Sequence, residues 1–89
     1  MLGENVWAGG YELDLILRRG GRLVFCEVKA KLGEGYGSPA EMVDAEKQRR
    51  LQRAAEAWLL AHPEAAALEV GFEVVSVTPD GVSRVGLDF

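Results

Sequence analysis

The chain has 89 residues, of which 48% are hydrophobic and 27% are charged, and its formal net charge is −4 at pH 7. This length suits a single domain over residues 1–89, so we expect any site to lie on one small core or between identical subunits. The acidic balance argues against a surface covered in basic residues for non-specific nucleic-acid binding, although it allows a local basic patch.

Nothing in the sequence indicates export or a membrane span. There is no apolar run long enough to cross a bilayer, and the start, MLGENVWAGG, lacks the basic and apolar regions of a signal peptide. We therefore expect a cytoplasmic protein. Cys26 is the one cysteine and His62 the one histidine, which excludes an internal disulfide and a structural zinc site. Alternation along its strand predicts that Cys26 is a small buried hydrophobe.

The first part of the chain predicts three strands. A short strand over Asn5–Ala8 precedes the turn signal Gly9-Gly10, and a longer one follows over Tyr11–Arg18. The glycines at Gly20-Gly21 supply the positive φ angles of a tight turn into a third strand, Arg22–Ala30. The second and third strands should therefore form an antiparallel hairpin.

A helix and two further strands are predicted after a glycine-rich loop over residues 32–37, which we interpret as a flap beside the site. Ser38 as the cap, Pro39 at the first helical position and Glu41 closing a capping box predict a helix from Pro39 to near His62. Its apolar positions recur every three or four residues: Met42, Val43, Leu51, Ala54, Ala55, Trp58 and Leu59.

The final strands are predicted over Leu68–Val77 and Val82–Leu87, on either side of the turn sequence TPDG. The order is thus β-β-β-α-β-β. Because the helix separates the third strand from the fourth, these two strands can be parallel through a right-handed crossover. We therefore predict an α/β fold, a mixed sheet with one long helix on a face.

Two of the strands carry acids where a core strand would carry Val or Leu. Alternation places Glu12, Asp14 and Ile16 on one face, with Leu13, Leu15 and Leu17 on the other. The tight turn would bring Asp14 and Glu27 close together across the hairpin, with Lys29 beside them.

Such a cluster suits a hard divalent ion, which Asp14, Glu27 and the carbonyl of Val28 could bind, with Lys29 steadying charge on a phosphate. Spacing alone leaves open that Glu27 and Lys29 form an ordinary surface ion pair.

The stretch ELDLI followed by LVFCEVKAK, a helix with EKQRRLQRAAEAWL and the strand GFEVVSV resembles the YraN-like family of small bacterial proteins, over residues 5–89. That family is grouped with the Holliday-junction-resolvase-like nucleases of the PD-(D/E)xK, restriction-endonuclease-like superfamily. The resemblance implies a minimal restriction-endonuclease-like fold and an endonuclease that uses Mg2+ or Mn2+ to hydrolyse DNA phosphodiesters, including those of branched DNA.

Position by position, the resemblance implies that Asp14 and Glu27 are metal ligands and that Lys29 is the catalytic lysine. Glu12 and Lys47 match further family positions that line the same cleft. A solvated Lys47 paired with Asp44 or Glu46 remains an equal alternative.

The chain departs from the family pattern at three places. It starts at the first strand, so the N-terminal helix of the family, with its additional acid, is expected to be missing. The glycine before the first acid is Tyr11, and the aspartate of the fourth strand is Glu73. We expect the uncovered sheet face to be buried by a second copy in a homodimer.

The basic residues are segregated along the chain. Nine of the ten lie between Arg18 and Arg53. We predict phosphate contacts from Arg18, Arg19, Arg22, Lys31, Arg49 and Arg50. The alternative is that the turn arginines are solvated and that the helix residues form i,i+4 ion pairs, such as Glu46 with Arg50. We interpret Arg53 as one of these helix residues and not as a phosphate contact.

Two other functions compete with the nuclease. A catalytically inactive relative would bind nucleic acid or a protein partner without cleavage. A small dimeric structural protein would use the Glu27–Lys29 pair only as a surface ion pair.

Overall fold

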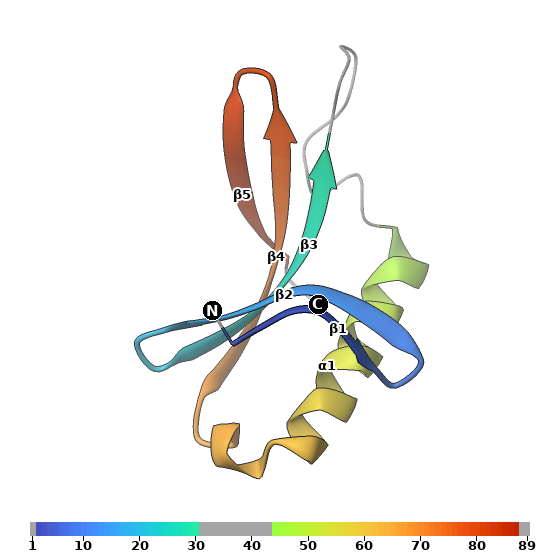
Figure 1. Ribbon diagram of the computed structural model, residues 1–89, viewed down its shortest axis with the longest axis vertical. Coiled ribbons are helices and arrows are strands. Elements are labelled where there is room, and N and C mark those ends of the chain that lie inside the picture. Colours follow the sequence, from blue (N-terminus) through green and yellow to red (C-terminus); the bar gives the residue numbers. More distant parts are fainter. Residues whose placement is uncertain (1, 31–43, 88–89) are drawn as a thin grey trace.

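The computed structural model describes residues 2–30 and 44–87. Within them the chain forms five strands, one α-helix and a short 3-10 turn (Figure 1). The elements are β1 (Gly3–Ala8), β2 (Tyr11–Arg19), β3 (Arg22–Ala30), α1 (Ala45–Ala61), η2 (Pro63–Ala65), β4 (Glu69–Thr78) and β5 (Gly81–Leu87). The predicted order β-β-β-α-β-β is confirmed. The glycine-rich loop expected to act as a flap lies outside the described residues.

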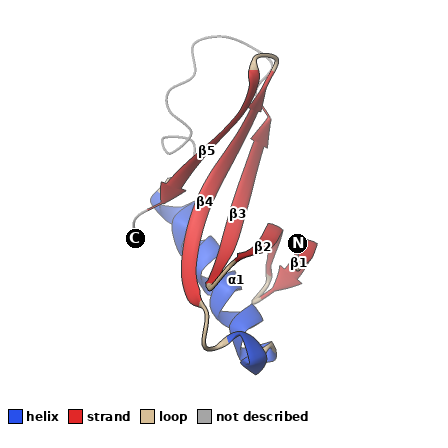
Figure 2. Ribbon diagram, turned by 90° about the vertical axis from the view of Figure 1, so that its left-hand side faces the viewer, coloured by secondary structure: helices blue, strands red, loops and turns tan. Residues whose placement is uncertain are grey.

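The strands form one sheet in the order β1-β2-β3-β4-β5. Neighbouring strands are antiparallel except β3 and β4, which are parallel, as the intervening helix predicts. Figure 2 shows α1 on one side of the long strands β3, β4 and β5, with β1 and β2 set at an angle to them. This mixed α/β arrangement is consistent with a minimal restriction-endonuclease-like fold.

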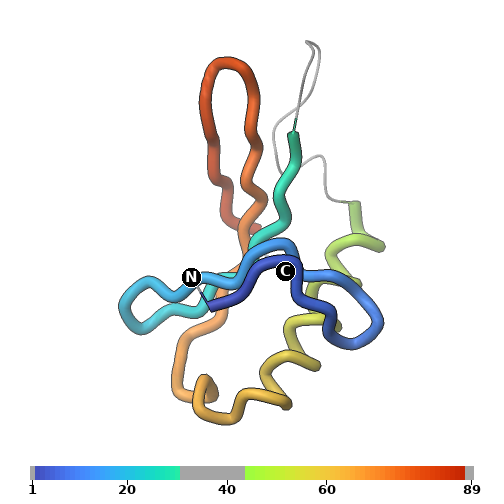
Figure 3. Tube along the Cα trace, viewed as in Figure 1, coloured from blue at the N-terminus to red at the C-terminus, as the bar shows by residue number. Residues whose placement is uncertain are grey.

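Glycines at the two N-terminal turns let the chain reverse tightly. Gly9 and Gly20 both have a φ of 59°, in the left-handed region that other residues avoid. The turns they form lie on opposite sides of the molecule (Figure 3). Gly9 also approaches α1 closely, since a Cβ there would lie 3.2 Å from the carbonyl oxygen of Arg53. The β1–β2 turn is therefore packed against the helix.

The main core lies between the sheet and α1. Phe25 packs edge-on against Trp58 from the helix and stacks on Phe72 from β4, with ring centroids 5.8 and 5.7 Å away. Such aromatic pairs add to the free energy of burying their surface. The cluster's buried members are Leu13, Ile16, Leu23, Phe25, Leu51, Ala54, Ala55, Trp58 and Ala65.

The predicted assignment of β2 residues to faces is wrong in one respect. Leu13 and Ile16 are both fully buried in the helix-side core, although strict alternation would separate them. The backbone is irregular at this point, because Asn5, which lies between the paired residues Glu4 and Val6 of β1, has a φ of 50°. Alternation is therefore interrupted at Asp14.

A second, smaller cluster lies on the other face of the sheet. It contains Val24, Cys26 and Val75, with Leu15, Leu17 and Val28 packed around them. Burial raises the pKa of the Cys26 thiol to about 11, and the Glu73 carboxylate contributes to the rise. Cys26 is a buried hydrophobe, as predicted.

The helix begins later than predicted. The expected first residues, from Ser38 to Val43, lie outside the described residues, and Asp44 is extended, with ψ at 175°. Asp44 caps the helix, because its carboxylate accepts a hydrogen bond from the N–H of Lys47 at 2.9 Å. The predicted start at Pro39 is therefore wrong for the helix that carries Leu51 and Trp58, which starts at Ala45.

In the part of the chain that the structure describes, no helix has the length and apolar character needed to cross a membrane.

Candidate functional site

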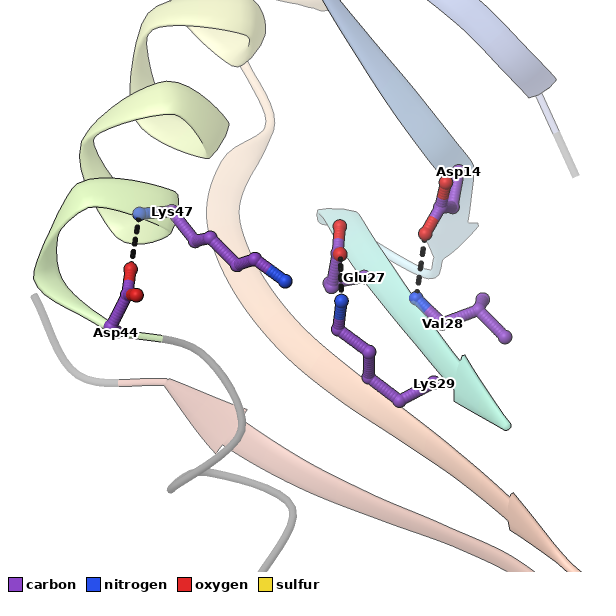
Figure 4. Close-up of polar contacts among 6 residues, drawn as sticks. All are labelled: Asp14, Glu27, Val28, Lys29, Asp44 and Lys47. Carbon is purple, nitrogen blue, oxygen red and sulfur yellow. Dashed lines mark hydrogen bonds and ion pairs between the residues drawn. The ribbon is translucent and has the colours of Figure 1, made fainter. Parts of the chain in front are cut away.

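Asp14 lies where β2 separates from β3. The paired residues of these strands run from Arg19 with Arg22 up to Leu15 with Cys26, so Asp14 and Glu27 come next in register. Instead of continuing the backbone ladder, the chain uses a side chain: Asp14 Oδ2 accepts a hydrogen bond from the N–H of Val28 at 2.8 Å. Figure 4 shows the Asp14 carboxylate directed at the Val28 N–H of β3, with the Glu27 side chain one residue earlier on the same strand. Asp14 is thus held against β3 at Val28, the residue that follows Glu27.

Glu27 and Lys29 point to the helix side of β3, two residues apart. The ammonium of Lys29 lies 3.1 Å from Glu27 Oε1, and their side chains are only 23% and 22% exposed. A solvated surface pair would be far more exposed than this. The partial burial favours a site in which the charges are held apart from bulk water.

Lys47 reaches this pair from the first turn of α1. The Asp44 cap fixes the backbone at Lys47, and the side chain extends toward Glu27 and Lys29 (Figure 4). A hydrogen bond with Lys29, reinforced by the charge of Lys29, lowers the pKa of Lys47. The same hydrogen bond with Lys47, together with the Glu27 carboxylate, raises the pKa of Lys29. Lys29 is therefore the more firmly protonated of the two amines.

A cavity of about 180 Å³ adjoins these groups. Its walls come from β2, β3 and α1, and Glu12, Glu27 and Lys47 supply its charged groups. The other lining residues are Tyr11, Arg50 and Leu51. The predicted placement of Glu12 and Lys47 on one cleft with Glu27 agrees with this geometry.

The donor atoms fit a hard divalent cation. One oxygen of Asp14 binds the Val28 N–H and one oxygen of Glu27 binds Lys29, which leaves Asp14 Oδ1 and Glu27 Oε2 outside these contacts. Within residues 2–30 and 44–87, no group of three or more His, Cys, Asp or Glu side chains converges on one point. Mg2+ is commonly held by one or two carboxylates with several waters, which is the kind of donor set that Asp14 and Glu27 offer. The N–H of Val28 positions the Asp14 carboxylate. The role of the Val28 carbonyl as a metal ligand stays a prediction.

Arginines of α1 form a groove next to the cavity. Arg49, Arg50 and Arg53 line it with Tyr11 and Glu46, and Tyr11 and Arg50 are shared with the cavity itself. Arg50 is anchored by Glu46 at 2.6 Å, the predicted pair, and its guanidinium lies 5.7 Å from the centre of the Tyr11 ring. Of the predicted phosphate residues, Arg50 thus lines the cavity with Glu27, and Arg49 lines the groove next to it.

The turn arginines lie at the opposite end of the β2–β3 hairpin from Asp14. Arg19 binds Glu73 at 2.7 Å, and Arg18 donates to the carbonyl of Gly20 at 3.1 Å. The guanidinium of Arg22 lies over Gly71, where a Cβ would collide with it. The structure does not bring these three residues to the carboxylates. Lys31 lies outside the described residues.

Sequence reasoning missed two residues of this surface. Tyr11 was noted only as a departure from a family glycine, yet it lines both the cavity and the arginine groove. Arg53 was interpreted as a member of the helix ion pairs and not as a phosphate contact, but it lines the groove, and it lies on the same helix face as Arg49, four residues earlier. That spacing was the signal that could have identified Arg53.

Comparison with known proteins gives a consistent result. Residues 1–77 match the model of a family described as "Uncharacterised protein family UPF0102". A UPF0102 protein of Frankia alni is 50% identical over 76 residues, which cover 83% of this chain and 62% of the relative.

Two further UPF0102 proteins show similar identity. One from Magnetococcus marinus is 50% identical over 66 residues, covering 74% of this chain and 53% of the relative. One from Methylorubrum extorquens is 44% identical over 78 residues, covering 88% and 59% respectively. The chain therefore spans about three fifths of the length of the curated relatives it matches.

Proposed function

The chain belongs to the uncharacterised UPF0102 family, the YraN-like family that its strand motifs resemble, and we propose that it is a metal-dependent nuclease acting on DNA phosphodiesters, including those of branched DNA. The observation that carries this proposal is the convergence of Asp14, Glu27 and Lys29 at one end of the β2–β3 pair, with Lys47 opposite them. We further propose that it acts in the cytoplasm.

Asp14 and Glu27 would hold Mg2+ or Mn2+ through their remaining oxygens. Such an ion, when bound, lowers the pKa of a water ligand and neutralises charge on a phosphate oxygen. The hydrogen bond from Val28 fixes Asp14 before any ion binds, which reduces the reorganisation that binding requires.

The two lysines would act on the phosphate and the attacking water. Lys29 keeps its proton, because its hydrogen bond with Lys47 and its contact with Glu27 raise its pKa. It can therefore donate a hydrogen bond to an oxygen on which negative charge develops. Lys47 loses its proton more easily than an ordinary lysine, which suits a residue that accepts a proton from water.

The arginine groove would carry the rest of the DNA backbone. Arg49, Arg50 and Arg53 add positive charge next to a cavity that holds two acids. Guanidinium groups bind phosphate with paired hydrogen bonds. If a DNA strand bound its phosphates along this groove, the neighbouring phosphates of the same strand would lie in the cavity that contains Glu27.

A cleavage assay tests the proposal. Branched and linear DNA are incubated with the protein and Mg2+ or Mn2+, and Glu27→Gln is compared with Glu56→Gln, a matched change on the exposed face of α1. We expect Glu27→Gln to lose at least about 100-fold in rate, since it removes one metal ligand, and Glu56→Gln to retain the wild-type rate. Lys29→Ala should lose cleavage but keep Mn2+ binding. Equal cleavage by all of these proteins would contradict the proposal.

A second candidate is an inactive relative that binds nucleic acid or a protein partner. It is favoured by the small number of acids, because among the described residues the cavity is lined by only two, Glu12 and Glu27, and no three acids gather at one point. This candidate predicts DNA binding that weakens as salt increases, without metal-dependent cleavage.

We also propose a homodimer. The residues that support it are the partly exposed Leu15, Leu17 and Val28 on the sheet face opposite α1. Analytical ultracentrifugation of the wild-type protein would test it, and a monomer at micromolar concentration would contradict it.

A further inference from the structure

Asn5 has a backbone conformation that strands rarely contain. Its φ is 50°, and no other non-glycine residue within 2–30 and 44–87 has a positive φ. It lies in the middle of β1, where an extended backbone is usual. Asparagine is one of the few residues besides glycine that adopt the left-handed conformation readily. The Asn5 side chain is exposed, so packing in the core does not explain this conformation.

The alternation of faces along β1 is interrupted at Asn5. In a regular strand, residues three apart lie on opposite faces. Gly3 and Val6 instead lie on one face, because a Cβ at Gly3 would be 2.8 Å from Val6 Cγ2 and 3.3 Å from Ile16 Cδ1. Val6 and Ile16 both belong to the core beneath α1. A residue between Gly3 and Val6 must therefore break the alternation, and the positive φ identifies it as Asn5.

The neighbouring strand β2 is interrupted at the same level. Leu13 and Ile16 are also three residues apart, and both are fully buried in the helix-side core. In the register of β1 and β2, the pairs directly before and after Asn5 enclose one residue of β2, which is Asp14. The two interruptions therefore adjoin each other, one in each strand.

These interruptions account for the direction of the Asp14 side chain. In a regular strand a side chain stands roughly perpendicular to the sheet, whereas the N–H groups of the neighbouring strand lie in the plane of the sheet. The Asp14 carboxylate nevertheless accepts a hydrogen bond from the N–H of Val28 on β3 at 2.8 Å (Figure 4). Its side chain therefore runs along the sheet toward β3, at the level where β1 also departs from regular geometry.

We propose that Asn5 is a positioning residue for Asp14: its left-handed backbone maintains the interruption that turns the Asp14 carboxylate toward β3. The inference rests on the proposed function and deepens it, because it assigns the orientation of one metal ligand to a residue that does not line the cavity. A residue that disfavours a positive φ would favour regular pairing of β1 and β2, and regular alternation would return Asp14 to a face of the sheet. Metal affinity then falls with the fraction of molecules that keep the present arrangement.

Two substitutions separate the backbone of Asn5 from its side chain. Asn5→Gly removes the side chain and keeps access to a positive φ, whereas Asn5→Ala removes the side chain and disfavours a positive φ. Hydrogen exchange of the Val28 N–H, measured by NMR relative to that of Val24, which is paired with Leu17 in the β2–β3 ladder, reports on the Asp14 contact without any metal. Calorimetry with Mn2+ reports on the proposed site. Thermal unfolding monitored by circular dichroism verifies that each variant is folded.

We expect Asn5→Gly to keep the wild-type exchange ratio and the wild-type Mn2+ affinity. Asn5→Ala should raise the exchange of Val28 relative to Val24 and weaken Mn2+ binding, each by about 5- to 30-fold, which corresponds to the cost of the left-handed conformation.

Equal effects of the glycine and alanine substitutions, or wild-type values in Asn5→Ala, would overturn the inference. Faster exchange of Val28 and Val24 by the same factor would also overturn it, since Asn5 would then contribute only to general stability. If the wild-type protein binds no Mn2+, the proposed function fails, and the exchange of Val28 alone decides whether Asn5 positions Asp14.

Discussion

At the scale of single residues, the Asp14 carboxylate takes the place of a backbone group. It accepts a hydrogen bond from the Val28 N–H where the β2–β3 ladder ends, so one side chain takes over a hydrogen bond of β3 at the residue that follows Glu27. Unpaired backbone groups are costly when buried, which gives this position a structural role as well as a chemical one. Asn5, with its positive φ, marks the same irregularity on β1.

The lysine pair allows a prediction about protonation. The hydrogen bond and the charge of Lys29 lower the pKa of Lys47, so in Lys29→Met we expect the pKa of Lys47 to rise toward the ordinary lysine value. Lys47 would then stay protonated to a higher pH than in the wild type. An NMR titration that observes the side-chain Nζ atoms measures this directly. Arg49→Met, which removes a charge from the same helix, is the control, and an unchanged pKa in Lys29→Met would refute the pairing.

At the scale of elements, the β1–β2 turn and the first turn of α1 hold the two sides of the site. The turn is packed on the helix at Gly9, and the helix begins at the Asp44 cap three residues before Lys47. Neither contact touches the carboxylates. Both nevertheless fix the positions of groups that line the cavity.

Gly9 and Gly20 form a matched pair for testing the turn. Both have a φ of 59°, so alanine should cost each about 1–2 kcal/mol in the left-handed region. A Cβ at Gly9 also meets the Arg53 carbonyl and Ala57, whereas at Gly20 it meets nothing within 4 Å. Gly9→Ala should therefore lose about 1–3 kcal/mol more free energy of unfolding than Gly20→Ala. Urea denaturation measures both variants, and equal losses would show that the contact with α1 has no energetic weight.

The Asp44 cap gives a second prediction for this element. Asp44→Ala removes the acceptor of the Lys47 N–H and should cost about 1 kcal/mol of stability, within the usual range for a lost cap. Asp44→Ser keeps an acceptor and should restore most of that loss. Thermal unfolding of the three proteins provides the comparison. A serine variant as unstable as the alanine variant would mean that charge, not capping, is responsible.

The elements also differ in how far sequence alone could define them. Tight turns and alternation located β2 and β3 to within a residue, because glycines and strand periodicity are local signals. The predicted start of α1 was wrong, because Ser38, Pro39 and Glu41 form a stronger local capping signal than Asp44 does. Asp44 is nevertheless the cap of the described helix. The burial of Leu13 with Ile16 depends on the backbone at Asn5, which no periodic pattern reveals.

At the scale of the whole molecule, the fold divides the arginines into a group on α1 and a group at the β2–β3 turn. The carboxylates and two lysines meet between β2, β3 and α1, and the helix arginines adjoin them, while Arg19 pairs with Glu73 at the other end of the hairpin. Sequence predicted the carboxylate pair, because one hairpin register determines it. It could not decide among the arginines, because their positions depend on how the hairpin and helix pack.

The central claim is that Asp14 and Glu27 hold a divalent ion, and a calorimetric Mn2+ titration tests it most directly because it requires no substrate. We compare the wild-type protein with Asp14→Asn and with Glu56→Gln, an exposed acid distant from the cavity lining. The account predicts saturable binding in the wild type and Glu56→Gln, and its loss in Asp14→Asn. Binding of equal strength in all three proteins, or none in any of them at millimolar Mn2+, would contradict it.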